Sequence, residues 1–168
     1  TGGLKTEKEL HIKSGTYTMG NNLIVGDIAY QISMSGTDNT YVSALTVNGS
    51  YNESGIQDFG QPTVLTGSNG NNDVTLLSVA TNGKPVNISG LSFQEAKIGL
   101  NATTLGNGKL TLKNSAFRKT GEFGMKISDA ANEGALIANT LFADGETGLN
   151  VVSGSQVKVV NATFANNN

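Results

Sequence analysis

Short stretches of alternating apolar and polar residues recur along the second half of the chain. Four of them share the pattern apolar-x-apolar-x-(Gly/Asn)-x-x-Phe and begin at Val86, Leu110, Ala135 and Val157. The Phe residues that close them are spaced by 24, 25 and 22 positions. A second apolar segment follows each of the first three, at residues 99–102, 124–127 and 148–151. Because alternation with a period of two is typical of β-strands, each repeat predicts two short strands joined by polar turns.

A strand this short cannot bury an apolar face alone, whereas repeats stacked along an axis share a continuous core. In parallel, in-register sheets, equivalent residues lie ~4.8 Å apart. We therefore expect three inward columns: Val86, Leu110, Ala135 and Val157; Ile88, Leu112, Ile137 and Val159; and Phe93, Phe117, Phe142 and Phe164. The repeat predicts an all-β fold, a parallel β-helix solenoid.

The residue that ends the first strand of each repeat is Gly or Asn: Gly90, Asn114, Asn139 and Asn161. A turn at this position needs a backbone conformation that Gly and Asn tolerate best. Stacked Asn side chains can also hydrogen-bond amide to amide along the column. Turn chemistry alone and an asparagine ladder are therefore both consistent with the pattern.

The first half of the chain is less regular. Strands are expected at residues 10–17, 23–25, 30–34, 44–47, 63–65 and 77–79, separated by long Gly/Asn/Ser loops. At about 24 residues per rung, the chain would hold about seven rungs. We expect one β-helix domain over residues 1–168, with irregular early rungs over 10–85 and regular rungs over 86–168. The pattern is interrupted at the last residues, so we expect a fragment of a longer chain.

Composition narrows the classes of function. Lys and Arg number 11 against 13 Asp and Glu, for a net charge of −2, which argues against a nucleic-acid-binding protein. The absence of Cys excludes disulfide scaffolds and thiolate zinc sites, and the presence of a single His argues against a Ser-His-Asp triad. The sequence contains no run of 18 apolar residues, so it predicts no membrane-spanning helix.

Three segments carry a resemblance to a known fold family: Ile12–Tyr17 (Ile-Lys-Ser-Gly-Thr-Tyr), Pro62–Gly67 and Val86–Phe93. They resemble the opening strand and following rungs of the right-handed parallel β-helix, or pectin-lyase-like, repeat proteins. That family includes polysaccharide lyases, glycosidases, phage tailspikes and stalks of bacterial surface proteins. The chain is most similar to the non-catalytic bacterial surface, or adhesin, type. The resemblance implies an extracellular or cell-surface module that binds surface glycans or a host or cell-surface protein.

The strongest candidate for lyase chemistry surrounds Arg118, the single Arg of the chain. A pectate-lyase-like site needs clustered carboxylates for Ca²⁺ and a basic side chain that removes a proton. Two positions after each Phe stand Glu95, Lys119, Asp144 and Asn166, which would be rung neighbours. Their charges alternate, which favours a solvated ion-pair ladder over a metal site.

Other candidate sites are less specific. Glycosidases need two facing carboxylates, for which Asp144 with Glu146 and Asp129 with Glu133 qualify. A sugar-binding groove would use the four tyrosines of the first third: Tyr17, Tyr30, Tyr41 and Tyr51. His11 is expected to face solvent or to cap the first rung, and the oxygen-rich segment 69–73 is interpreted as a loop rather than a Ca²⁺ site. We therefore assign no catalytic, metal-binding or cofactor-binding residue and expect no enzyme, with a polysaccharide lyase as the alternative.

Two surface features predict contacts with partners. Leu136, Ala138 and Val160 are outward positions that lie close together, which predicts that a loop, a following segment or another protomer covers them. The last rung would leave an open sheet edge, which predicts end-to-end self-association. Five Asn-x-Ser/Thr sequons occur, but Asn161 is a ladder position and would not carry a glycan.

Overall fold

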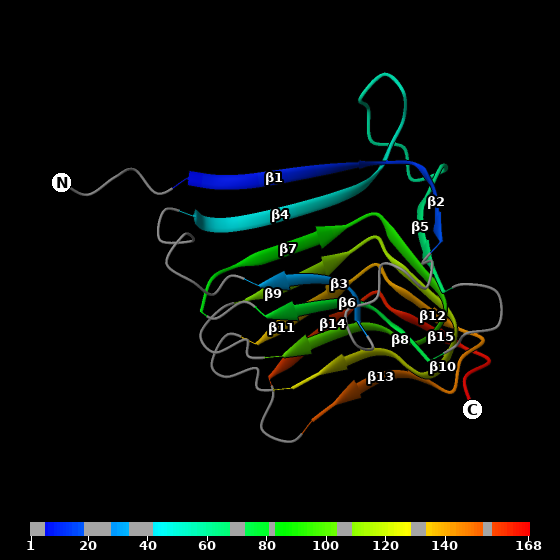
Figure 1. The fold of residues 1–168 in the computed structure, drawn as a ribbon. Helices are drawn as coiled ribbons and strands as arrows, with labels where there is room; N and C mark the ends of the chain where they lie inside the picture. The colour runs from blue at the N-terminus through cyan, green and yellow to red at the C-terminus, as the bar shows by residue number, and fades with distance from the viewer. Residues whose placement is uncertain are drawn as a thin grey trace.

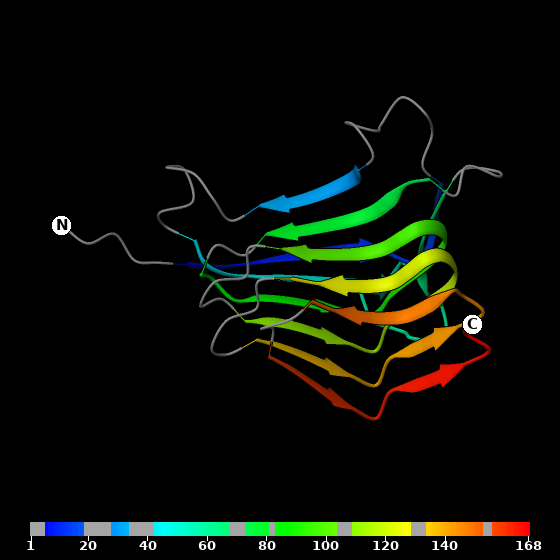
Figure 2. The ribbon, with the colours of Figure 1, turned by 90° about the horizontal axis from the view of Figure 1, so that it is seen from below.

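The strands of this protein pair in parallel, and the chain winds through them as a coil (Figure 1). The computed structural model describes residues 6–18, 28–33, 42–67, 73–80, 83–103, 109–128, 134–152 and 156–168. The predicted all-β parallel β-solenoid is confirmed in these residues. In the turned view, strands from successive rungs lie one below another (Figure 2).

Two parallel sheets form the walls of the coil. The first has six strands in the order β1 (Thr6–Lys13), β4 (Val42–Tyr51), β7 (Val86–Ser89), β9 (Leu110–Lys113), β11 (Ala135–Ala138) and β14 (Val157–Val160). The main path of the second sheet is β15 (Thr163–Ala165), β12 (Leu141–Ala143), β10 (Ala116–Ile127), β8 (Leu91–Thr103), β5 (Thr63–Thr66) and β2 (Gly15–Thr18). Off this path lie β3 (Ile28–Ser33), β6 (Thr75–Ala80) and β13 (Thr147–Val151).

The long strands β8 and β10 take part in two faces of the coil. The first residues of β8 pair with β5, and its residues from Ile98 to Thr103 pair with β6. In the same way β10 pairs first with β12 and then with β13. In these two rungs, the predicted second strand is therefore not separate. Residues 99–102 belong to β8 and residues 124–127 belong to β10.

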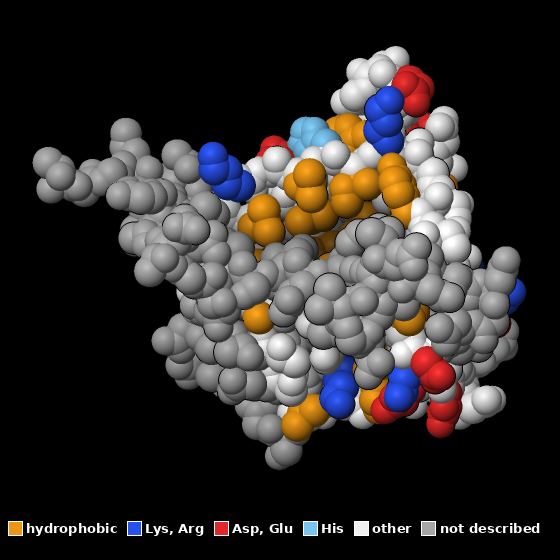
Figure 3. All heavy atoms as spheres, in the orientation of Figure 1, with side chains coloured by type: hydrophobic (Ala, Val, Ile, Leu, Met, Phe, Trp, Pro, Cys, Tyr) orange, Lys and Arg blue, Asp and Glu red, His pale blue; other side chains and the backbone are white. Residues whose placement is uncertain are grey.

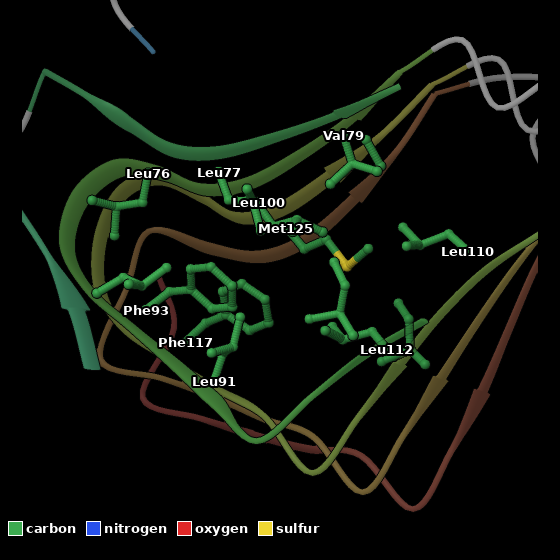
Figure 4. Packing of buried hydrophobic residues seen from close by; sticks show 14 of the residues in the cluster. Leu76, Leu77, Val79, Leu91, Phe93, Leu100, Leu110, Leu112, Phe117 and Met125 are labelled. Atoms are coloured by element: carbon green, nitrogen blue, oxygen red, sulfur yellow. The ribbon is translucent and has the colours of Figure 1, made fainter. Parts of the chain in front are cut away.

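The three predicted columns are confirmed by the strand register. Each first-sheet column follows the pairing β7–β9–β11–β14, which places Val86, Leu110, Ala135 and Val157 in one row and Ile88, Leu112, Ile137 and Val159 in the next. The four Phe rings stack face to face, with successive centroids 4.7, 4.9 and 4.8 Å apart and ring planes within 8° of parallel. Figure 4 shows Phe93 and Phe117 one behind the other in the interior, beside Leu91.

The prediction of about seven rungs was wrong: the solenoid has about three turns. The regular turns run from β7 to β14, where Ile88, Leu112, Ile137 and Val159 follow one another at the predicted spacing. In the earlier half, Leu10 pairs with Val47 and Val47 pairs with Ile88, steps of 37 and 41 residues. The long loops of that half use residues that a constant rung length would assign to additional rungs. Of the strands expected there, residues 23–25 lie outside the described residues.

The solenoid leaves apolar side chains exposed at both ends of the stack. In the rungs between the two ends, the column side chains are buried: Phe93, Leu112 and Ile137 are 0% exposed. At the β1 end Leu10 is 52% exposed, and hydrophobic side chains are open to solvent beside His11 (Figure 3). At the other end Phe164 is 51% exposed. In the two terminal rungs, like side chains therefore have a column neighbour on one side only among the residues that the structure describes.

The asparagine ladder is formed, together with the turn that requires it. Asn114, Asn139 and Asn161 all have φ near +50°, the left-handed region. The Asn139 amide donates to Asn114 Oδ1 at 3.2 Å, and the Asn161 amide donates to Asn139 Oδ1 at 3.4 Å. The ladder interpretation is therefore confirmed and turn chemistry alone is not sufficient, because the same Asn residues adopt the left-handed turn and bond to one another along the column.

Replacing Asn139 should separate these two roles. Asn139→Ala places a Cβ-bearing residue without a local hydrogen bond at φ 49° and removes both ladder bonds, so we expect the free energy of unfolding to fall by about 1–2 kcal/mol. Asn139→Gly also removes the ladder bonds, but Gly adopts a positive φ without strain, so the free energy of unfolding should fall by less than in Asn139→Ala. Urea unfolding of both variants measures the difference. Equal losses would show that the left-handed backbone contributes nothing.

Candidate functional site

A column of charged and polar side chains lies at the bend of the second sheet. It consists of Glu95, Lys119, Asp144 and Asn166, the residues two positions after the stacked Phe rings; we call it the charged corner column. All four have φ between 52° and 59°, so the backbone turns sharply at each. This turn lets β8 and β10 bend from one face of the coil to the next.

Pairing along the charged corner column joins neighbouring rungs. Lys119 Nζ lies 3.7 Å from Glu95 Oε1, and the Asn166 amide donates to Asp144 Oδ1 at 3.1 Å. The basic partner of Asp144 is Arg118, whose Nη1 lies 3.5 Å from Asp144 Oδ2. The predicted ion-pair ladder is therefore present, with Arg118 in the place that the alternation assigned to Lys119. These side chains are 40–67% exposed, so each ion pair contributes about 0–1 kcal/mol.

A depression of about 690 Å³ borders this column. Of the two carboxylate pairs that the sequence suggested, the pair within the described residues, Asp144 and Glu146, lines this depression. Its lining includes Asp144, Glu146 and Lys119. Between the two acids, the Gly145 amide donates to the Asn167 side chain at 3.2 Å, so this backbone donor is already used within the chain. The arrangement can bind a polar ligand through side chains of both signs. In the described part of the chain, no three His, Asp or Glu residues gather as a metal site would require.

Several sequence candidates are not brought together. Asp129 and Glu133 lie outside the described residues, as do Tyr41 and all of segment 69–73 except Asp73. Tyr17 is 37% exposed, and its hydroxyl donates to the Lys13 carbonyl at 3.3 Å. This bond fixes the ring near the β1–β2 corner. Of a groove formed by all four tyrosines, the described residues give no geometry.

His11 stacks on Tyr51 and binds Glu9 on the outer face of β1. The two ring centroids are 4.1 Å apart with planes 9° from parallel, and His11 Nε2 lies 2.8 Å from Glu9 Oε1. The His11 side chain is 49% exposed, as expected for a solvent-facing residue of the first rung. The hydrogen bond from His11 holds the pKa of Glu9 below its ordinary value of 4.5, and the Asn48 amide, 2.7 Å from the same oxygen, acts in the same direction.

Removing the His11 hydrogen bond should raise the pKa of Glu9 toward 4.5. The change His11→Phe keeps an aromatic ring on Tyr51 but removes the donor. Because the folded-state pKa is lowered, the contribution of Glu9 to stability is present above 4.5 and is lost as the pH falls through the folded-state value. Titration of the Glu9 carboxyl by NMR checks the shift. An unchanged pKa in the variant would contradict the assignment to His11.

A second candidate surface lies on the outer face of the first sheet, and sequence reasoning found only its apolar part. Leu136, Ala138 and Val160 line one depression of about 520 Å³, which confirms that they lie close together. Leu136 and Ala138 are half-buried, and Val160 is 37% exposed. The same depression is lined by three lysines, Lys109, Lys113 and Lys158. Lys113 and Lys158 occupy outward positions of the repeat alignment, so a comparison of charge across the outward columns would have found these two, whereas Lys109 precedes the repeat and would not have been found.

The loop between β4 and β5 is a further exposed feature that the sequence did not indicate. Ile56 is 64% exposed and Phe59 is 51% exposed. Asn52 Oδ1 accepts from the amides of Ser54 and Ile56, each at 3.0 Å, so the loop is held by its own hydrogen bonds. The loop therefore presents two large apolar side chains on a backbone with internal support.

The described residues contain no helix long and apolar enough to cross a membrane.

Comparisons with known proteins add no identification. Searches of protein-family models, of curated proteins and of solved structures found no match to this chain.

Proposed function

We propose that this chain is a non-catalytic structural and adhesive module, a right-handed parallel β-helix in a secreted or cell-surface bacterial protein. The observation that carries the proposal is the uninterrupted stacking of like side chains, above all the four parallel Phe rings. A solenoid whose regular rungs, from β7 to β15, repeat the contacts of their neighbours suits a spacer or a display surface. Right-handed connections between parallel strands are the general rule, which supports the handedness.

The outer surface supports an adhesive role more than a catalytic one. In the charged corner column, acidic and basic side chains alternate and pair across rungs instead of converging on a common point. These pairs are exposed to water, where charges are strongly screened. By contrast, the outer face of the first sheet and the β4–β5 loop both present apolar side chains to solvent. Surfaces of this kind mark contacts with other molecules.

The proposed partners are surface glycans, a host or cell-surface protein, or other copies of this chain. Exposed column ends favour self-association, because Leu10 at one end and Val159 at the other belong to the same column of the first sheet. Stacked in register, such ends would bury one another.

A polysaccharide lyase or glycosidase is the alternative function, favoured by one observation. Asp144, Glu146 and Lys119 line the same depression, with Arg118 in contact with Asp144. Carboxylates and a basic group around one hollow are the components that either reaction uses.

Incubation with polysaccharides tests the proposal against this alternative. The chain is mixed with polygalacturonate and with alginate, with and without Ca²⁺, and unsaturated product and new reducing ends are followed. We expect neither to rise above the level of a heat-inactivated sample. Product formation that Arg118→Gln or Asp144→Asn abolishes, while the variants remain folded by circular dichroism, would overturn the non-catalytic assignment.

A further inference from the structure

We propose that the depression around Leu136, on the outer face of the first sheet, binds an acidic protein segment that carries apolar side chains. We call this surface the lysine-framed face; its residues are Lys109, Lys113, Lys158, Leu136, Ala138 and Val160. The inference deepens the proposed adhesive function and rests on it, since it names the chemistry of one partner.

The floor of the lysine-framed face is apolar because two outward columns meet there. Leu136 lies between Thr111 and Lys158 in the register, and Ala138 lies between Lys113 and Val160. The core side of the same strand is filled by the buried Ala135 and Ile137. The apolar atoms outside therefore do not belong to the core, and a partner that binds here would bury them.

The described charges around this floor have one sign. Among the residues that the structure describes, the lining includes three lysines and no carboxylate. Within the described ranges, Lys13, Lys97, Arg118 and Lys119 each lie within 4 Å of a carboxylate. None of the three lysines of the lysine-framed face has such a neighbour in that part of the chain. An apolar centre whose rim of cations has no carboxylate neighbour among the described residues is complementary to an acidic partner.

Side chains, rather than strand addition, would make the contact at the centre of this face. The strand β11, which carries Leu136, pairs with β9 on one side and β14 on the other, so its backbone groups are already bonded. A partner must therefore supply apolar side chains for the floor and carboxylates for the rim.

The neighbouring amides favour a peptide over a sugar. Asn139 and Asn161 also line the depression, but they bond to each other along the asparagine ladder. Sugar hydroxyls are recognised by free polar groups and by aromatic rings, whereas the floor here is aliphatic. Apolar contact and charge remain as the means of recognition.

Binding of synthetic peptides tests the proposal with the full chain. The probe is a fluorescent peptide of alternating Glu and Leu, about ten residues long so that it spans the face. A Glu–Ser peptide and a Lys–Leu peptide are the controls, and anisotropy is measured at low salt and at about 0.5 M salt. We expect the Glu–Leu peptide to bind, the two controls to bind at least about fivefold more weakly, and high salt to weaken binding.

Variants locate the site. The double change Lys113→Gln/Lys158→Gln and the single change Leu136→Thr should each lower the affinity about three- to tenfold, since rim charges and small apolar contacts have modest effects. Lys97→Gln, whose lysine pairs with Glu122 elsewhere on the solenoid, is the matched control and should leave binding unchanged. Thr keeps the preference for a strand at position 136, and circular dichroism verifies each variant.

Three results would overturn the inference. One is no binding of the Glu–Leu peptide, and another is equal binding of the Glu–Ser peptide, which would leave charge alone as the cause. The third is stronger binding of polygalacturonate that the lysine variants abolish, which would identify a glycan site. If one of these results is obtained and no polysaccharide is cleaved, the inference fails but the proposed non-catalytic function stands. Cleavage of a polysaccharide contradicts that function, whether or not the peptides bind.

Discussion

Replacing Phe117 with Ala should lower the free energy of unfolding by about 3–5 kcal/mol, the range for truncation of a buried Phe. The ring is 1% exposed and lies between Phe93 and Phe142, at centroid distances of 4.7 and 4.9 Å. The substitution leaves a cavity and removes two stacking contacts at once. Because neighbouring rungs hold the backbone in register on both sides, the cavity cannot close by a local shift.

Phe164→Ala is the matched control at the end of the same column. Phe164 has a single ring neighbour among the described residues, Phe142 at 4.8 Å, and is 51% exposed. We expect a loss of about 1–2 kcal/mol, less than half that of Phe117→Ala. Denaturant unfolding followed by circular dichroism measures both. Equal losses at the two positions would mean that the column does not stabilise the fold by stacking.

A methyl group added at Gly124 should also be severely destabilising, by about 2–3 kcal/mol or more. A Cβ there would lie 2.6 Å from the Gly148 carbonyl oxygen and 3.1 Å from Phe117 Cβ. Gly99 is in the same situation, since a Cβ at that position would lie 2.7 Å from the Gly124 carbonyl oxygen. The Phe column fills the space that side chains at these positions would need, so a column of Gly accompanies the column of Phe.

Gly121→Ala separates crowding from the general effect of replacing Gly. It lies in the same strand, β10, and a Cβ there meets only the Ala96 carbonyl oxygen, at 3.9 Å. We expect a change within about 0.5 kcal/mol. Thermal unfolding of both variants decides the point. If Gly124→Ala proves as stable as Gly121→Ala, the close approach of the rungs at Gly124 is not rigid.

The columns could be predicted because each is written in the sequence at a nearly constant spacing. Alternation in Val86–Ser89 and its equivalents fixes which side chains face inward, and the Phe period fixes the register. The rung number could not be predicted in the same way. A loop such as that between β4 and β5 adds residues without adding a rung. No pattern in its sequence indicates how many residues lie in the loop rather than in a strand of the solenoid.

The bends of β8 and β10 were also missed, for a local reason. Glu95 and Lys119 adopt φ near +50°, a conformation that the sequence does not signal at Glu or Lys, which seldom adopt it. Because the chain turns within a strand, the expected break between two strands of a rung disappears.

The candidate sites were predicted in part. Spacing placed Glu95, Lys119 and Asp144 in one column, but the choice of Arg118 as the partner of Asp144 depends on side-chain conformation. The apolar centre of the lysine-framed face followed from the outward positions of Leu136 and Ala138. Its lysines come from two rungs, Lys109 immediately before β9, Lys113 at the end of β9 and Lys158 within β14, and the distance between their charges depends on how far each side chain extends along the sheet.

A crystal structure of this chain tests the central claim, that successive turns place like side chains on like, most directly. We predict Phe93, Phe117, Phe142 and Phe164 in one row, with parallel rings and successive centroids about 4.7–4.9 Å apart. Rings dispersed among different contacts, or antiparallel pairing of the four segments that contain them, would contradict the solenoid and the functions inferred from its surfaces.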